Sequence, residues 1–186
     1  MSSLSDPHPD QRRDELAREV SQVLRDVPDF PEPGIVFKDF TPLLADPGLS
    51  ARVVDDLAGR HRGEIDIVAG IEARGFVFGA ATAYALAVPF VPIRKAGKLP
   101  SATYRVDYDL EYGSATLEMH TDAVRPGQRV LLVDDVLATG GTAAATVELL
   151  RRAQAHVSAV EVILELGFLS GREAVPDVMV RSLLST

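Results

Sequence analysis

The sequence contains no cysteine, and this absence excludes disulfide bonds and thiolate metal sites. It also lacks any run of basic residues, and its formal net charge of −8 argues against nucleic acid as the main partner, because phosphate backbones bind basic surfaces. No stretch reaches the length of a membrane span, and the first residues contain no apolar segment typical of a signal peptide. We therefore expect a cytoplasmic protein that binds neither nucleic acid nor membrane.

Histidine is scarce as well. The four histidines are scattered, and none pairs with another at metal-ligand spacing, so surface or packing roles are expected of them. The chain has 186 residues, of which 46% are hydrophobic, and this is ample for the core of one domain over residues 1–186. Residues 1–11 are polar and include two prolines, so we expect them to be disordered.

The apolar residues follow helical and strand patterns in turn. Their spacing predicts helices over residues 10–26, 49–62, 76–86 and 142–155, and strands over residues 65–69, 88–93, 130–133, 157–166 and 178–184. Strands that alternate with helices indicate an α/β fold, with a mostly parallel central sheet and helices on both faces. Between the first two helices, Pro28, Pro31 and Pro33 exclude a helix and favour an extended path.

Residues 95–120 depart from this alternation. They carry three tyrosines among charged residues, and apolar and polar residues then alternate from Ala115 to Met119. A long polar excursion in a compact domain is usually a lid or a disordered loop, and the cations Arg94, Lys95 and Lys98 at its start favour a lid. We predict a flexible, hairpin-like flap that rises from the sheet.

The most informative segment is residues 130–142, where a hydrophobic strand meets Asp134 and Asp135 and a loop of small residues precedes a helix. Small residues at such a junction let backbone N–H groups approach an anion, and the helix N-terminus adds partial positive charge. The carboxylates repel phosphate but suit sugar hydroxyls or a metal ion. The segment therefore predicts a ligand with a phosphate at one end and a diol at the other, such as a ribose 5-phosphate.

This segment resembles the phosphoribosyl-diphosphate (PRPP) signature of the type I phosphoribosyltransferases. Residues 28–39, 72–76, 94–100 and 110–113 resemble further segments of the adenine-specific members of that family, in the family's order. The resemblance implies the type I phosphoribosyltransferase-like fold with an N-terminal hood and a catalytic flap. It also implies a homodimeric enzyme of purine salvage that joins adenine to the ribose of PRPP, releasing diphosphate and giving AMP.

The same resemblance implies roles for individual residues. PRPP would be bound by Asp134, Asp135, Ala138, Thr139, Gly140, Gly141, Thr142, Arg74, Lys95 and Lys98. Adenine would contact Val36, Phe37 and Lys38, and the family commonly has arginine in place of Lys38. Glu111 would handle the proton as a catalytic residue beside Arg74 and Lys95, while Tyr112 of the flap would exclude water. A cis peptide bond would join Ala73 to Arg74. Mg²⁺ would arrive mainly on PRPP, so no residue is assigned as a metal ligand.

Alternatives remain for single residues and for the function. Asp134 can serve only to cap the loop, Arg74 can be an ordinary surface arginine, and Phe37 can pack in the core rather than against a base. The enzyme can also use another purine, because only the base-contacting residues separate these activities. A PRPP-sensing regulator without turnover is the alternative from a different class; the acidic charge and the lysines and glutamate of the flap argue against it.

Overall fold

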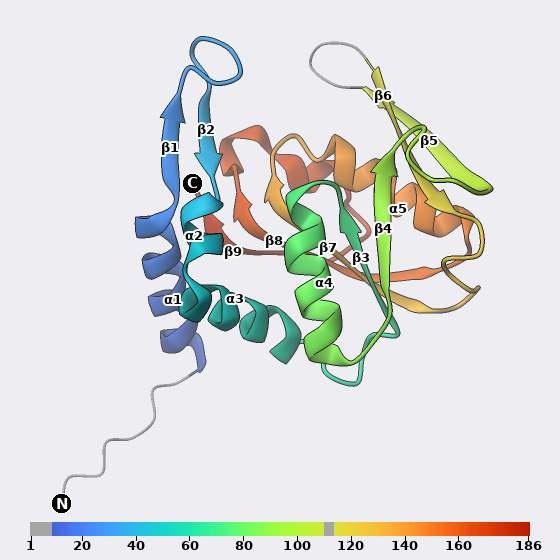
Figure 1. Cartoon of the computed structure of the whole chain (residues 1–186), viewed down its shortest axis with the longest axis horizontal. Helices are drawn as coiled ribbons and strands as arrows, with labels where there is room; N and C mark the ends of the chain where they lie inside the picture. Colours follow the sequence, from blue (N-terminus) through green and yellow to red (C-terminus); the bar gives the residue numbers. More distant parts are fainter. Residues whose placement is uncertain (1–8, 110–113) are drawn as a thin grey trace, which may run out of the picture. The chain divides into compact units, whose positions relative to one another are not determined.

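The computed structural model describes residues 9–109 and 114–186, and its central feature is a sheet of seven strands (Figure 1). The parallel strands are β3 (Ile67–Ile71), β4 (Phe90–Lys95), β7 (Arg129–Leu137), β8 (His156–Glu165) and β9 (Val180–Ser185). The hairpin of β5 (Thr103–Asp109) and β6 (Ser114–His120) completes the sheet in the order β5-β6-β4-β3-β7-β8-β9. The predicted α/β fold with a mostly parallel sheet is confirmed.

The chain divides into two compact units, Met1–Asp56 and Leu57–Thr186, and the sheet belongs to the second. The first unit contains α1 (Pro9–Val23), the antiparallel pair β1 (Arg25–Pro28) and β2 (Val36–Asp39), α2 (Thr41–Ala45) and most of α3 (Pro47–Gly59). The paired strands and α2 were not predicted, because the prolines around them interrupt the periodic spacing of apolar residues. The single domain expected over residues 1–186 stays a prediction.

Two helices cover the two faces of the sheet in the second unit: α4 (Arg74–Leu86) and α5 (Gly141–Arg152) (Figure 1). Because side chains alternate along a strand, Ala69 and Gly70 of β3 point to opposite faces. Gly70 lies against α4 so closely that a Cβ built on it would be 2.7 Å from the Gly75 carbonyl oxygen. The helix therefore packs backbone to backbone on one face.

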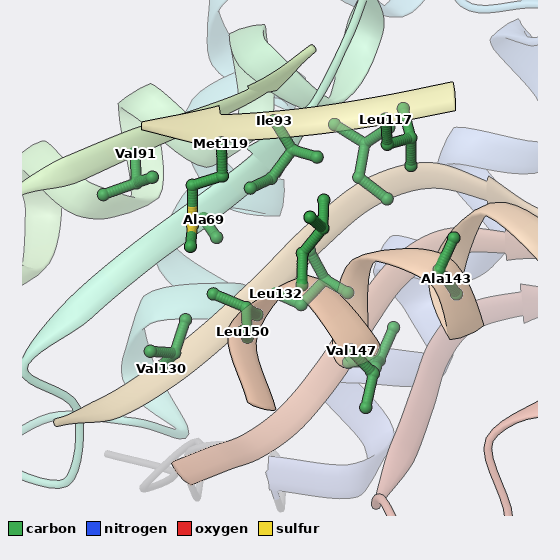
Figure 2. Close-up of a cluster of buried hydrophobic side chains, with 14 of the residues drawn as sticks. Ala69, Val91, Ile93, Leu117, Met119, Val130, Leu132, Ala143, Val147 and Leu150 are labelled. Atoms are coloured by element: carbon green, nitrogen blue, oxygen red, sulfur yellow. The ribbon is translucent and has the colours of Figure 1, made fainter. Parts of the chain in front are cut away.

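The other face carries the main hydrophobic cluster (Figure 2). Ala69, Ile93 and Leu132 of three neighbouring strands lie there with Val147 and Leu150 of α5, and all five side chains are buried. Their burial supplies the hydrophobic free energy that holds α5, and with it the loop before α5, against the sheet.

Strand β7 is longer than the prediction of residues 130–133. It continues through Leu137 and so includes Asp134 and Asp135, because its backbone stays paired with β8, where Asp134 lies opposite Val162 and Leu137 opposite Glu165. Backbone pairing does not depend on the polarity of the side chain. The acidic pair therefore lies inside the sheet, and the two side chains leave it on opposite faces.

The predicted hairpin is present as β5 and β6, with Thr103 opposite His120 and Asp109 opposite Ser114. It extends the edge of the sheet, since β6 pairs with β4. After β8 the chain forms two short 3-10 helices, η1 (Gly167–Leu169) and η2 (Gly171–Ala174), before β9. None of the helices in the described part of the chain has the length and apolar character that a bilayer span requires.

Candidate functional site

The loop of residues 138–142 joins β7 to α5 and forms the wall of a small cavity. Gly140 is the N-cap of α5 and adopts the left-handed conformation, with φ of 83°. The first N–H groups of a helix have no acceptor within it, so the amides of Gly141, Thr142 and Ala143 are oriented toward the open end of α5. The helix start adds partial positive charge, and the loop therefore provides what an anion requires.

The cavity has a volume of about 80 Å³ and brings most of the predicted phosphate and ribose ligands together. The predicted residues that line it are Asp134, Ala138, Thr139, Gly140, Gly141 and Thr142. Apolar residues of the sheet, among them Ile71 and Val162, form the rest of its lining. An anionic group at the loop and a hydroxyl-bearing group at Asp134 would thus share one space.

Asp134 and Asp135 are neighbours in sequence but have different surroundings. Asp134 is partly buried, and its Oδ1 accepts a hydrogen bond from the Asp135 N–H at 2.9 Å. Burial raises the pKa of Asp134, and the nearby charge of Asp135 raises it further. Asp134 therefore holds a proton more readily than an ordinary aspartate does.

Asp135 is 5% exposed and forms an ion pair with Arg74, whose Nε contacts Asp135 Oδ2. Within the described residues, no hydrogen bond is donated to this buried oxygen, even though the arginine is adjacent. Arg74 offsets the charge of this buried carboxylate, and a ligand hydroxyl would add the hydrogen bond that Oδ2 lacks. The structure thus brings Arg74 and Asp135 together, as the predicted PRPP site requires.

Arg74 is the first residue of α4, directly after β3 and a short turn. The expectation of a cis peptide bond between Ala73 and Arg74 is wrong by one residue: the cis bond joins Glu72 to Ala73. The sequence pattern does not distinguish adjacent bonds of this turn, because both are flanked by similar small and polar residues.

A second pocket, of about 350 Å³, is lined by cationic side chains at the end of β4. Its lining residues are Glu72, Ala73, Phe76, Arg94, Lys95 and Lys98. Lys95 and Lys98 therefore line one pocket, whereas Arg74, which was predicted to bind PRPP with them, is not among its lining residues. The pocket contains three cations and one carboxylate, a composition that suits a multiply charged anion.

Glu72 organises the cations of this pocket. Its carboxylate accepts hydrogen bonds from the Lys95 N–H at 3.0 Å and Arg94 Nε at 3.1 Å, and Lys98 Nζ lies 3.4 Å away. Burial raises the pKa of Glu72, but these donors outweigh burial and leave the pKa below its ordinary value. Glu72 is thus ionised and holds three cationic residues in one place.

Glu118 of β6 holds the same loop from the other side. Its side chain is fully buried, and Oε1 accepts hydrogen bonds from the N–H groups of Lys98 and Leu99, both at 2.9 Å. Arg105 Nε lies 3.5 Å from Oε2. Burial raises the pKa of Glu118, but the backbone N–H donors outweigh it and the net shift is downward. The sequence did not lead us to assign a role to Glu72 or Glu118. For Glu118, the available signal was a carboxylate between two apolar residues, Leu117 and Met119.

The predicted adenine ligands lie on β2 in the first unit and do not share one face of that strand. Val36 is exposed, and Lys38 Nζ forms an ion pair with Asp26 Oδ1 at 2.5 Å. Phe37 alternates to the other face and makes an edge-to-face contact with Phe30, with ring centroids 5.1 Å apart. Packing of Phe37 within its own unit is therefore established, and base contact by these residues stays a prediction.

The predicted flap residues Glu111 and Tyr112 lie outside the described residues. Among residues 9–109 and 114–186, no cluster of three or more histidine, aspartate or glutamate side chains is arranged to hold a metal ion.

Similarity to known proteins agrees with this geometry. The family model of the phosphoribosyl transferase domain matches residues 44–176. The adenine phosphoribosyltransferase of Thermobifida fusca is 58% identical over 165 residues, which are 88% of this chain and 94% of that protein. The adenine phosphoribosyltransferase of Nocardioides sp. is 57% identical over 172 residues, 90% of this chain and 93% of that protein.

Solved structures show the same relationship. The crystal structure of adenine phosphoribosyltransferase from Thermoanaerobacter pseudethanolicus superposes with a TM-score of 0.89 at 45% identity, covering 91% of this chain and 99% of that one. The enzyme from Saccharomyces cerevisiae, in complex with an imino-altritol bisphosphate and adenine, gives a TM-score of 0.88 at 40% identity, again covering 91% and 99%. Sequence and structure thus agree over nearly the whole chain.

Proposed function

The chain belongs to the adenine phosphoribosyltransferase family, a branch of the phosphoribosyltransferases, and we propose that it catalyses the reaction of that family. Adenine and PRPP become AMP and diphosphate, a step of purine salvage. The observation that carries this proposal is the cavity that the loop of residues 138–142 and Asp134 line together.

The loop of residues 138–142 binds the 5-phosphate of PRPP. Its amides at the start of α5 donate to the phosphate oxygens, and the hydroxyls of Thr139 and Thr142 add further donors. Glycine at 140 and 141 leaves no side chain between the anion and the backbone. This part of the site supplies binding and orientation rather than chemistry.

The acidic pair binds the ribose. Asp135 Oδ2, which receives no hydrogen bond from the described residues, accepts one from a ribose hydroxyl, and Asp134 lines the cavity where a second hydroxyl lies. Arg74 contacts Asp135, so the cation for the diphosphate is next to the acceptor for the sugar. This matches PRPP, in which the diphosphate on C1 neighbours the 2-hydroxyl.

The diphosphate leaves C1 with its electron pair as the C1–O bond breaks, while adenine N9 forms the new bond to C1. Arg74, Lys95 and Lys98 offset the growing negative charge on the leaving group, which lowers the barrier. Glu111 accepts the proton that N9 loses, and Tyr112 excludes water from the cationic sugar. Val36, Phe37 and Lys38 contribute to adenine binding.

Mg²⁺ would be held mainly by the oxygens of PRPP rather than by residues of the chain. In this proposal Asp134 and Asp135 serve the ribose hydroxyls. When bound, the ion would neutralise charge on the diphosphate. We therefore assign no residue of the chain to the metal.

We further propose that the enzyme acts in the cytoplasm as a homodimer. Light scattering would test the dimeric state.

A panel of free purines with PRPP and Mg²⁺ tests the reaction and the base together. We expect adenine to give AMP and diphosphate, and hypoxanthine, guanine and xanthine to react much more slowly. Chromatography of the nucleotide products measures each rate. Nucleotide formed only from another purine would reassign the base. PRPP binding without any nucleotide product, at micromolar enzyme, would instead indicate a regulator.

A further inference from the structure

A second backbone segment, η2, lies in direct contact with the loop of residues 138–142. A Cβ built on the buried Gly171 would lie 2.2 Å from the Ala138 carbonyl oxygen and 3.1 Å from the Gly140 nitrogen. A Cβ built on Gly140 would lie 2.2 Å from the Gly171 carbonyl oxygen. Real Cβ atoms do not approach other atoms so closely, so neither side of this contact admits a side chain.

Arg172 holds η2 at this position. Its guanidinium makes a forked pair with Glu165 at the end of β8, with Nε 2.5 Å from Oε1 and Nη2 2.6 Å from Oε2. Nη1 also donates to the Val180 carbonyl oxygen at 2.5 Å, and Ser182 Oγ donates to Glu165 Oε2 at 2.9 Å. The arginine thus connects η2 to both β8 and β9.

The contacts of Arg172 also show what it does not do. Its guanidinium nitrogens are engaged with Glu165, Val180 and Ser182, so its charge is used within the fold rather than for a substrate phosphate. Glu165 is 6% exposed, and a planar guanidinium matches its two oxygens in a way that lysine does not. The fork therefore fixes orientation as well as charge.

We propose that Gly171 is a positioning residue for the 5-phosphate of PRPP, and that the Arg172–Glu165 pair holds Gly171 against the loop of residues 138–142. The proposal rests on the function proposed above, which assigns this loop to the phosphate. The amides of the loop bind phosphate only while they converge on one point, and a displacement of about 1 Å is enough to cost much of the rate. Segment η2 is the wall that prevents this displacement.

Gly171→Ala tests the wall, with Gly59→Ala as the matched control, because a Cβ at Gly59 meets nothing within 4 Å. We expect the KM for PRPP and the Kd for ribose 5-phosphate to rise by about tenfold to a hundredfold in Gly171→Ala, since the new methyl group displaces the loop. The KM for adenine should change less than about twofold, because the loop is not assigned to the base. Gly59→Ala should keep all three constants at the wild-type values.

Arg172→Lys is an independent test of the same proposal, and it remains informative if Gly171→Ala does not fold. Lysine keeps the charge but loses the fork, so the KM for PRPP should rise by about three- to tenfold with the adenine KM unchanged. A folded Gly171→Ala variant with the wild-type Kd for ribose 5-phosphate would overturn the inference and leave the proposed function intact. Equal losses for adenine and PRPP would also overturn it, because they would show a general structural defect. If wild-type protein neither binds ribose 5-phosphate nor forms AMP, the proposed function itself is wrong.

Discussion

The two loops of the second unit that we propose to bind the anionic groups of PRPP differ in how they are built and held. The phosphate loop, residues 138–142, presents backbone amides at the start of α5 and is held by backbone contact with η2. The basic loop, residues 94–99, presents the side-chain charges of Arg94, Lys95 and Lys98 and is held by the carboxylates of Glu72 and Glu118. The first depends on exact packing and the second on charge.

This difference suits the two groups that PRPP offers. The 5-phosphate keeps its charge and place through the reaction, so a neutral, rigid cradle can bind it throughout. The diphosphate gains charge as it leaves, and cationic side chains that Glu72 and Glu118 hold in place offset that gain. We therefore expect the phosphate loop to respond most to changes of shape, and the basic loop to salt and pH.

The largest effect should come from one of two glycines that have nearly the same positive φ. Gly140 and Gly97 have φ of 83° and 82°, but a Cβ at Gly140 meets the Gly171 carbonyl oxygen at 2.2 Å, whereas one at Gly97 meets nothing within 4 Å. Gly140→Ala should raise the KM for PRPP by about a hundredfold or more, because strain and collision act together. Gly97→Ala carries only the strain, about 1–2 kcal/mol, and should cost about tenfold or less. Equal losses in steady-state kinetics would contradict the contrast.

Glu118→Gln tests whether a buried carboxylate holds the basic loop. The amide keeps the shape but offers weaker acceptors to the N–H groups of Lys98 and Leu99, so kcat/KM for PRPP should fall by about tenfold. Glu148→Gln is the control, since Glu148 is an exposed carboxylate paired with Arg152 at 3.0 Å. That variant should lie within about twofold of wild type, as exposed ion pairs contribute little. A wild-type rate in Glu118→Gln would mean that the basic loop orders itself.

A smaller difference between the two loops should appear in how binding of their ligands depends on ionic strength. In the reverse reaction, the KM for diphosphate should rise with ionic strength in wild type, because the basic loop binds through exposed charges. Lys98→Gln should raise that KM by about fivefold and flatten its dependence on salt. Arg125→Gln, which removes an exposed cation outside both pockets, should keep the wild-type slope. A steep slope retained in Lys98→Gln would remove Lys98 from the diphosphate site.

The smallest effect concerns stability at acid pH. The pKa of Glu118 is lowered in the folded protein, so the stability it contributes is complete above the ordinary glutamate pKa of about 4.3 and is lost as pH falls through the lower folded value. The free energy of unfolding should therefore fall more steeply below about pH 4 in wild type than in Glu118→Gln. Urea titrations from pH 6 to pH 3 measure this difference. Asp134, with a raised pKa, changes the free energy of unfolding with pH in the opposite direction, but it does so equally in wild type and Glu118→Gln, so its effect cancels in the comparison. Parallel plots of unfolding free energy against pH for the two proteins would contradict the prediction.

Local pattern was sufficient to predict most elements of the sheet and the phosphate loop. The helices α4 and α5 and the strands β3, β4, β7, β8 and β9 all overlap the segments predicted from periodicity. The loop was predictable because its small residues, its glycines and the helix that follows are consecutive in sequence. Local pattern also marked residues 95–120 as a departure from the alternation of helices and strands, and much of that segment forms the hairpin of β5 and β6.

Long-range packing decided what the pattern did not reveal. Alternation along β6 places a charged residue between two apolar ones, and only the neighbouring loop explains why Glu118 is fully buried there. Gly171 lies about thirty positions beyond Gly140 in the chain, and no local feature marks it as part of the phosphate loop. The unequal surroundings of Asp134 and Asp135 likewise follow from the extension of β7 and the position of Arg74.

The sequence by itself determined the α/β architecture and the chemistry available at one strand-to-helix junction, because periodicity, small residues and charge act between close neighbours in the chain. Only the tertiary structure decided which carboxylates hold the basic loop, which acidic residue meets Arg74, and which glycine supports the phosphate loop. These choices depend on contacts between segments far apart in the sequence, where a difference of an ångström separates a tight contact from a collision.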